Sequence, residues 1–216
     1  MKLNNRQEKL VNKEQFNTIK YYDQNAIRYA HDTFNVSTKH LYKPFLKHIP
    51  PHGLILDVGC GSGRDIKAFS ELGYKVEGLE PSAKLAEIAS ENSNLPIIIG
   101  LAQDIDAVDK YDGIWACASL LHISRIYLPA TLHRLVGALK LGGVLFVSFK
   151  KGDTERITEE GRFFNDQTCE SLQELFTHLS NIEIVQHWET SDSLHRGIDV
   201  SWTNMIIRRT SYWQSL

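Results

Sequence analysis

A short glycine-rich segment has the composition of a ligand-binding turn. Residues 54–63 read Leu-Ile-Leu-Asp-Val-Gly-Cys-Gly-Ser-Gly, so an apolar run ends at an acid and alternating glycines follow. A buried strand that passes through such glycines into a helix offers backbone N–H groups to a ligand, and glycine permits positive φ there. The carboxylate of Asp57 would repel a phosphate and attract a cationic group. The segment therefore favours a nucleotide-like ligand that carries a positive charge, with a capping role for Asp57 as the alternative.

Glu80 is a second acid with an informative spacing. It follows the next apolar run and lies 21 residues after Gly59. A carboxylate at the end of the second strand accepts hydrogen bonds from both hydroxyls of a ribose. That spacing also fits a dinucleotide. However, Arg64 stands where the dinucleotide fingerprint needs its third glycine, so NAD is disfavoured.

Several segments together resemble class I S-adenosylmethionine-dependent methyltransferases. Asp57–Gly63 resembles the first motif of that family, and the resemblance covers residues 50–150. The other matching segments are Gly78–Ser82, Gln103–Ile105, Tyr111–Ala118 and Leu139–Ser148. Within the family, residues 115–122 and Glu-Gly-Arg-Phe-Phe at 160–164 look most like small bacterial methyltransferases of the tellurite-resistance type.

The resemblance implies a cofactor, a reaction and a set of site residues. The cofactor is S-adenosylmethionine, and a methyl group passes by in-line displacement to a small-molecule acceptor, leaving S-adenosylhomocysteine. The residues expected to bind the cofactor are Asp57, Gly59, Cys60, Gly61, Arg64, Glu80, Pro81, Asp104, Ile105, Ala118, Tyr22 and Tyr29. The residues expected to act on the acceptor are His122 and Arg162.

Simpler explanations stand beside several of these roles. His122 is either a base near neutral pH or a packed histidine, and Asp104 is either an adenine contact or a cap. Arg64 either pairs with the methionine carboxylate or lies on a solvated face. Arg162, next to two phenylalanines, either binds an oxyanion or belongs to a solvated basic loop.

The N-terminal segment is expected to cover the site. Helical spacing over 16–34 places Tyr22 and Tyr29 on one face. The family resemblance implies that this helix closes over the cofactor as a lid. The alternative is a stripe of tyrosines packed on the core.

Size and composition narrow the classes of function. The 216 residues suffice for one α/β domain, and the net charge of −2 gives no general attraction for nucleic acid or an anionic membrane. No apolar run is long enough to span a bilayer, and the first residues lack an apolar signal region. The three cysteines are far apart and form no Cys-x-x-Cys pair. We therefore expect a cytoplasmic protein with free thiols, no metal site, no membrane association and no nucleic-acid partner.

Alternating apolar patterns predict a doubly wound α/β fold with a mostly parallel sheet. Strands are expected at 54–58, 75–79, 96–99, 113–118, 144–149, 182–188 and 200–208, and helices at 16–34, 37–47, 65–72, 81–88, 129–139 and 169–179. The family resemblance adds a final hairpin, which makes a seven-stranded sheet with one antiparallel strand. One domain over 1–216 is expected, with a lid region (1–50), a cofactor-binding core (51–150) and a substrate loop with the hairpin (151–216).

Other functions remain open at this point. The chain could be a non-catalytic S-adenosylmethionine-binding partner subunit, or it could methylate RNA with help from an RNA-binding partner. An NAD-dependent oxidoreductase is a third class. Arg64 counts against it, as does the lack of a Tyr-x-x-x-Lys pair.

Overall fold

The computed structural model describes residues 13–194 and 198–211. The polar N-terminal segment falls largely outside these ranges. The strands of the described residues are β1 (Leu54–Val58), β2 (Lys75–Glu80), β3 (Ile97–Ile99), β4 (Tyr111–Ala116), β5 (Leu139–Lys150), β6 (Glu155–Ile157), β7 (Phe163–Asn165), β8 (Ile182–Leu194) and β9 (Ile198–Arg209). The helices are α1 (Lys13–Thr33), α2 (Lys39–Leu46), α3 (Arg64–Glu71), α4 (Ala83–Ser93), α5 (Leu128–Ala138) and α6 (Cys169–Thr177), with short 3-10 turns η1 (Ala102–Asp104) and η2 (Leu120–His122).

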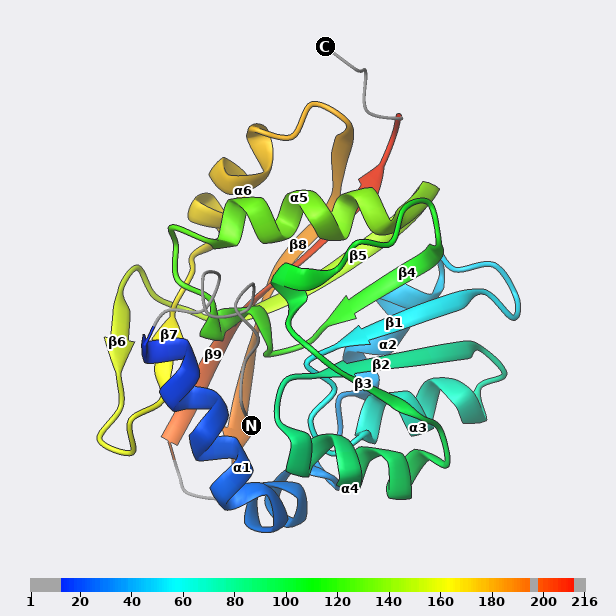
Figure 1. Cartoon of the computed structure of the whole chain (residues 1–216). Coiled ribbons are helices and arrows are strands. Elements are labelled where there is room, and N and C mark those ends of the chain that lie inside the picture. Colours follow the sequence, from blue (N-terminus) through cyan, green and yellow to red (C-terminus); the bar gives the residue numbers. More distant parts are fainter. Residues whose placement is uncertain (1–12, 195–197, 212–216) are drawn as a thin grey trace.

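One seven-stranded sheet organises the chain (Figure 1). Its strand order is β3-β2-β1-β4-β5-β9-β8. The pairs among β1 to β5 are parallel, and β9 is antiparallel to both β5 and β8. The predicted fold class, a mostly parallel Rossmann-like sheet with one antiparallel strand, is confirmed.

Helices cover both faces of the sheet because alternate strand residues are apolar on both sides. Leu145 and Val147 of β5 pack in the cluster that holds α5 and α6. Phe146 points the other way, into the cluster that contains α2 and α3, where its ring stacks on Trp115 at 4.1 Å. This double burial explains why the central strands are continuous apolar runs.

The carboxyl ends of β1, β2, β4 and β5 all lie at one edge of the sheet. The chain leaves β1 toward β2 and β3 on one side, then returns to β4 and β5 on the other, so the strand order reverses between β1 and β4. Ligands of open parallel sheets bind beyond such a reversal. Helix α1 crosses this edge, between α4 and the β6–β7 hairpin (Figure 1).

The segment 150–166, where no strand was expected, contains a small two-stranded sheet. β6 and β7 pair antiparallel, with Arg156 opposite Phe164. Strands of three residues are too short to show a period in the sequence. Phe163 and Phe164, both buried, bring this hairpin against the body of the protein.

Other boundaries differ by a few residues. β5 begins at Leu139, where helix was expected, because Leu139 pairs with Tyr111 ahead of a register shift. The helix expected over 37–47 begins at Lys39, after Thr38 in the cap position. Gly73 follows the end of α3 with φ of +89°, a conformation typical of a glycine that ends a helix. Among the described residues, none of the helices has the length and hydropathy needed to cross a membrane.

Candidate cofactor and acceptor site

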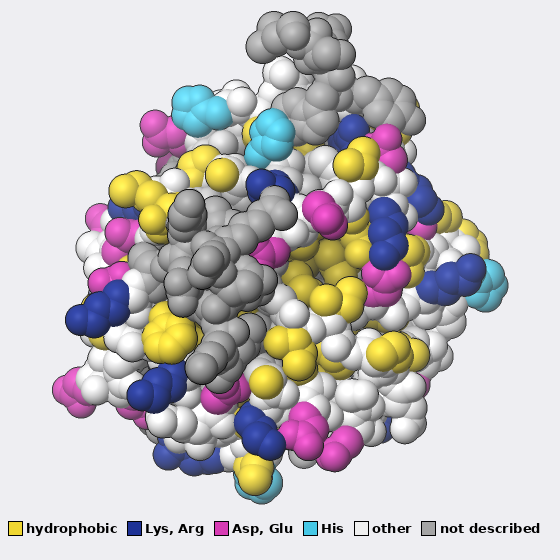
Figure 2. All heavy atoms as spheres, viewed as in Figure 1, with side chains coloured by type: hydrophobic (Ala, Val, Ile, Leu, Met, Phe, Trp, Pro, Cys, Tyr) yellow, Lys and Arg dark blue, Asp and Glu magenta, His cyan; other side chains and the backbone are white. Residues whose placement is uncertain are grey.

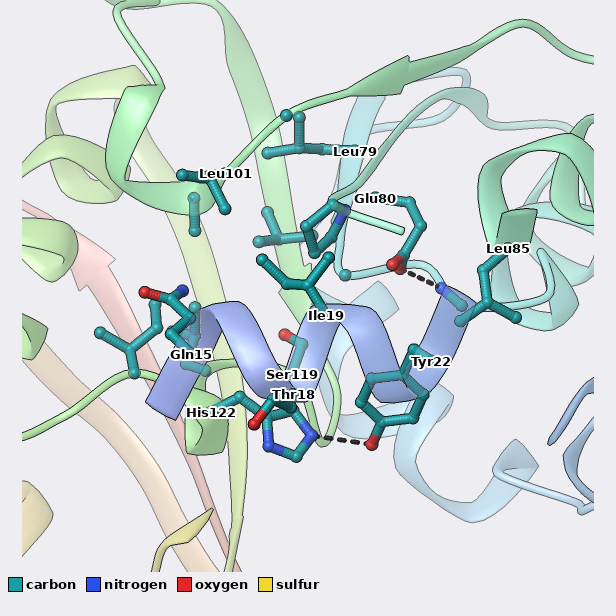
Figure 3. Close-up of a pocket in the computed structure, with 18 of the residues that line it drawn as sticks. Gln15, Thr18, Ile19, Tyr22, Leu79, Glu80, Leu85, Leu101, Ser119 and His122 are labelled. Carbon is teal, nitrogen blue, oxygen red and sulfur yellow. Dashed lines mark hydrogen bonds between the residues drawn. The ribbon is translucent and has the colours of Figure 1, made fainter. Parts of the chain in front are cut away.

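A cavity of about 660 Å³, part of it open to solvent, lies between α1 and the carboxyl edge of the sheet (Figure 3). The lining residues are Gln15, Thr18, Ile19, Tyr22, Tyr29, Val58, Gly59, Gly61, Leu79, Glu80, Pro81, Leu85, Gly100, Leu101, Ala102, Gln103, Ala118, Ser119, Leu120, His122 and Ile123. The wall is thus mainly apolar, with a few polar groups in it.

The glycine turn after β1 forms one wall and tolerates no side chains there. Gly59 has φ of +67°, and a Cβ on it would lie 2.5 Å from Cβ of Ser119. Gly61 has φ of +58°, a conformation that strains other residues, and a Cβ on it would lie in ordinary contact with the Tyr29 ring, 3.6 Å from its Cε1. Cys60, between them, does not line the cavity; it packs with Ile66 and Ala89 in a small apolar cluster. Only its backbone is therefore available to a ligand.

Glu80 is held rigidly at the end of β2. Its Oε2 accepts a hydrogen bond from the Gly61 N–H and its Oε1 from the Ser82 N–H, both at 2.9 Å. Burial raises the pKa of Glu80 to about 7, and these two N–H groups counter that effect. Each carboxylate oxygen keeps a free lone pair, so the group remains able to accept from two further donors.

Asp57 is buried beside the same turn, and its Oδ2 atom has no hydrogen-bond partner among the described residues. Burial, together with the nearby Asp65, raises the pKa of Asp57 well above its usual range. A buried, unpaired carboxylate is costly, so this position favours an added donor or cation.

Arg64 does not line the cavity, because its guanidinium is committed to its neighbour Asp65. Its Nε and Nη2 donate to the two oxygens of Asp65 at 2.8 and 2.9 Å. Asp65 also accepts from Tyr42 and from the Trp115 indole, at 2.6 and 2.9 Å. Arg64 therefore belongs to a buried network that ties α3 to α2 and β4.

The loop after β3 presents different residues from those the sequence suggested. Ala102 and Gln103 of η1 line the cavity, whereas Asp104 and Ile105 do not. Nε2 of Gln103 donates to Oε1 of Gln15 at 2.7 Å, so the first turn of α1 closes directly onto this loop. Pro81 does line the cavity, as expected.

Tyr22 and His122 meet at the other side of α1 (Figure 3). The Tyr22 hydroxyl lies 2.9 Å from Nε2 of His122, and Nδ1 of His122 lies 2.6 Å from the Phe163 carbonyl oxygen. A carbonyl only accepts, so Nδ1 carries the proton and Nε2 accepts from Tyr22. Burial, with the charges of Arg162 and Lys150, lowers the pKa of His122 to about 4. The imidazole is neutral at pH 7.

The end of β4 completes the wall. Ala118 lines the cavity with φ of +52°, a conformation supported by a 2.8 Å bond from its N–H to the Ser148 hydroxyl. Ser119 follows, and its Oγ is buried without a hydrogen-bond partner among the described residues. The Ser119 hydroxyl, which can donate and accept hydrogen bonds, is therefore available to a ligand.

Arg162 lies just behind the cavity wall. Its guanidinium packs on the rings of Tyr21 and Phe164, with centroids at 4.9 and 5.4 Å, and Nη2 bonds to Glu160 at 2.6 Å. Its positive charge also opposes the rise that burial gives to the pKa of Tyr22. Arg162 is thus brought beside Tyr22 and His122, without itself lining the cavity.

Three lining residues of α1 were missed: Gln15, Thr18 and Ile19. They extend the predicted face of Tyr22 by one and two turns toward the N-terminus. The helical period would have placed them there, but Gln and Thr give no apolar signal. Arg196, a weaker sequence candidate for the pocket, lies outside the described residues.

Residues 55–143 match the family model described as "Methyltransferase domain". The ubiquinone biosynthesis O-methyltransferase of Rhodopseudomonas palustris (strain HaA2) is 31% identical over 99 residues, which are 44% of this chain and 38% of that protein. An uncharacterized methyltransferase of Staphylococcus carnosus is 23% identical over 137 residues, 61% of this chain and 66% of that one. The chain thus spans less than half the length of the first relatives it matches.

Solved structures share the fold. A 1,6-didemethyltoxoflavin-N1-methyltransferase of Burkholderia thailandensis, crystallised with S-adenosylhomocysteine, has a TM-score of 0.72 at 20% identity and covers 94% of this chain and 92% of its own. The [4+2]-cyclase SpnF has a TM-score of 0.66 at 16% identity, covering 80% and 81%. At these identities the likeness concerns the fold. The family model and the curated relatives thus indicate a methyltransferase domain over residues 55–143, and they do not show the tellurite-resistance subtype.

Proposed function

We propose that this chain transfers a methyl group from S-adenosylmethionine to a small-molecule acceptor. The observation that carries the proposal is Glu80, a buried carboxylate in the cavity wall with both oxygens oriented by backbone N–H groups. The match of residues 55–143 to a methyltransferase domain supports it. A cytoplasmic setting is part of the proposal, supported by the free thiols of Cys60, Cys117 and Cys169.

The residues of the cavity fit this cofactor group by group. Glu80 would accept from the ribose hydroxyls, and the glycine turn leaves room for backbone contact. Gln103 and Leu101 would border the adenine, in place of the expected Asp104 and Ile105. The unpaired Oδ2 of Asp57 suits a ligand with an ammonium group, acting directly or through water.

When bound, S-adenosylmethionine supplies a methyl group that is electrophilic because it sits on a sulfonium. The protein's task is then to orient the two reactants and to exclude water. Helix α1 serves the second purpose, because Gln15, Thr18 and Tyr22 tie it to three separate parts of the cavity rim.

His122 acts by positioning Tyr22 in this proposal, and not as a general base. With a pKa of about 4 and its Nε2 lone pair already accepting from Tyr22, it is a poor proton acceptor at neutral pH. Arg162, whose charge acts on the same hydroxyl, would contribute positive charge on the acceptor side. An acceptor that arrives deprotonated needs no base.

A methyl-transfer screen tests the proposal. The full chain is incubated with S-adenosylmethionine and small oxyanions, thiols, amines, phenols and bulk RNA, and release of S-adenosylhomocysteine is measured. Turnover with a small molecule supports the proposal. Turnover with RNA only would replace it with the RNA-directed alternative, and tight cofactor binding without any turnover would favour a non-catalytic partner subunit.

A further inference from the structure

Three cationic side chains gather around one aromatic ring, next to the Tyr22–His122 pair. Nζ of Lys150 lies 4.4 Å from the centroid of the Phe164 ring, and the guanidinium carbons of Arg156 and Arg162 lie at 4.8 and 5.4 Å. The Phe164 ring in turn packs edge-on against His122, with centroids 4.8 Å apart. We call Lys150, Arg156 and Arg162 the cationic cluster.

The cluster carries more positive charge than its own carboxylates neutralise. Arg156 is paired with Asp166 through two bonds, at 2.7 and 3.3 Å, and Arg162 is paired with Glu160. Lys150 has no carboxylate within ion-pair distance in the part of the chain that the structure describes. Glu160 is shared with Arg28, at 4.0 Å, so the two carboxylates do not neutralise the cations around them.

Two donors in the cluster lack an oxygen acceptor. Lys150 is partly buried and contacts the Phe164 ring, and its pKa is lowered by burial and by the two guanidinium groups. Nε of Arg162 is buried, and no hydrogen-bond partner for it exists among the described residues. A buried donor without an acceptor is unfavourable, as at Nε of Arg162, and Lys150 has no carboxylate partner among the described residues, so a bound oxyanion would supply an acceptor to both residues.

The cluster is electrostatically coupled to the cavity. The charges of Arg162 and Lys150 both act on His122, whose ring lines the cavity. The Phe164 ring packs against His122, so an anionic group held by the cluster would lie one side chain away from the cavity.

We propose that the methyl acceptor carries a carboxylate, which binds at the cationic cluster through Lys150 and Arg162. This inference rests on the proposed function and names the acceptor class for the same site. The excess positive charge suits an anionic group, and a carboxylate can accept from an ammonium and a guanidinium at the same time. The surrounding rings of Tyr22 and Phe164 suit a flat, unsaturated body, so an aromatic carboxylate is the simplest probe.

Binding of benzoate and benzamide tests the inference, because the two differ mainly in charge. Calorimetric titrations are carried out on the full chain, with and without S-adenosylhomocysteine. We expect benzoate to bind about ten-fold or more tightly than benzamide, the scale of a charged hydrogen bond. Lys150→Met should abolish that preference and Lys150→Arg should keep it. Lys151→Met is the control, because Lys151 pairs with Glu189 at 2.8 Å away from the cluster.

Equal binding of benzoate and benzamide to the unmodified protein would overturn the inference, and so would an undiminished preference in a folded Lys150→Met variant. Failure of the proposed function looks different. In that case S-adenosylhomocysteine does not bind, whereas the preference for benzoate is measured independently in the product-free titration.

Discussion

The Tyr22 hydroxyl donates to Nε2 of His122 over 2.9 Å, joining the N-terminal helix to the turn that follows β4. The two residues are 100 positions apart in the chain. The bond is possible because the Phe163 carbonyl fixes the proton on Nδ1 of His122. One interaction therefore couples closure of α1 over the cavity to the orientation of the imidazole.

Tyr22→Phe should loosen the N-terminal helix. The substitution leaves Nε2 of His122 without its donor, at a cost of about 1–3 kcal/mol for an unsatisfied buried group. Amide hydrogen exchange of α1 should become faster by a corresponding factor. Tyr21→Phe is the matched control, since that hydroxyl bonds only to exposed groups, Glu160 and Arg28. Equal exchange rates in the two variants would contradict the role given to the Tyr22–His122 bond.

Cofactor affinity should depend on pH through Glu80. Its pKa is about 7 in the free protein, and ribose hydroxyls donate to the charged form, so binding lowers that pKa. Affinity for S-adenosylhomocysteine should therefore rise with pH up to about 7 and level off above it, by at most about ten-fold per pH unit. Glu80→Gln should bind more weakly, by roughly 1–3 kcal/mol at pH 8, and lack this dependence. Comparing the two proteins cancels titration of the ligand itself; parallel pH profiles would show that Glu80 is not the responsible group.

Substitutions of Gln103 and Asp104, in the loop that follows β3, should differ in their effect on cofactor binding. Gln103 lines the cavity and bonds to Gln15, whereas Asp104 lies outside the lining. Gln103→Ala should weaken binding of S-adenosylhomocysteine by about 1–3 kcal/mol, because a buried amide partner is lost. Asp104→Ala should change it by less than about 0.5 kcal/mol. The reverse order in calorimetry would restore the assignment that the sequence suggested.

Arg162→Ala should reduce methyl transfer while leaving the affinity for S-adenosylhomocysteine nearly unchanged. The guanidinium lies beside Tyr22 and behind the cavity wall, where it would act on the acceptor. We expect a loss in kcat/KM of about ten-fold or more, the scale of one charged hydrogen bond. Arg28→Ala is the control: Arg28 also approaches Glu160, at 4.0 Å, but its side chain is 61% exposed. A similar loss in both variants would mean that only surface charge matters.

The fold was predictable because its signals are local. A few adjacent residues around Gly59–Gly63 determine the strand, the glycine turn and the helix there. The cap of α4 at Ser82 is equally local. The alternation of such units then dictates a parallel sheet. The β6–β7 hairpin was missed because its stability comes from buried Phe163 and Phe164, which is a tertiary effect.

The candidate site was predictable only where a residue ends a strand. Glu80 lies at such an end, so its position followed from the order of the strands. Arg64 was expected to face a ligand, but its guanidinium is paired with Asp65. The Asp65 carboxylate is itself held by hydrogen bonds from the buried Tyr42 and Trp115. Long-range partners of this kind leave no pattern in the chain.

The cavity should bind S-adenosylmethionine and not a dinucleotide. Calorimetric titration of the full chain with S-adenosylhomocysteine and, separately, with NAD tests this selectivity, with Glu80→Ala as the site control. We expect binding of S-adenosylhomocysteine, weakened by roughly 1–3 kcal/mol in the folded Glu80→Ala protein, and no comparable binding of NAD. Tight binding of NAD together with none of S-adenosylhomocysteine would show that the cavity is a dinucleotide site.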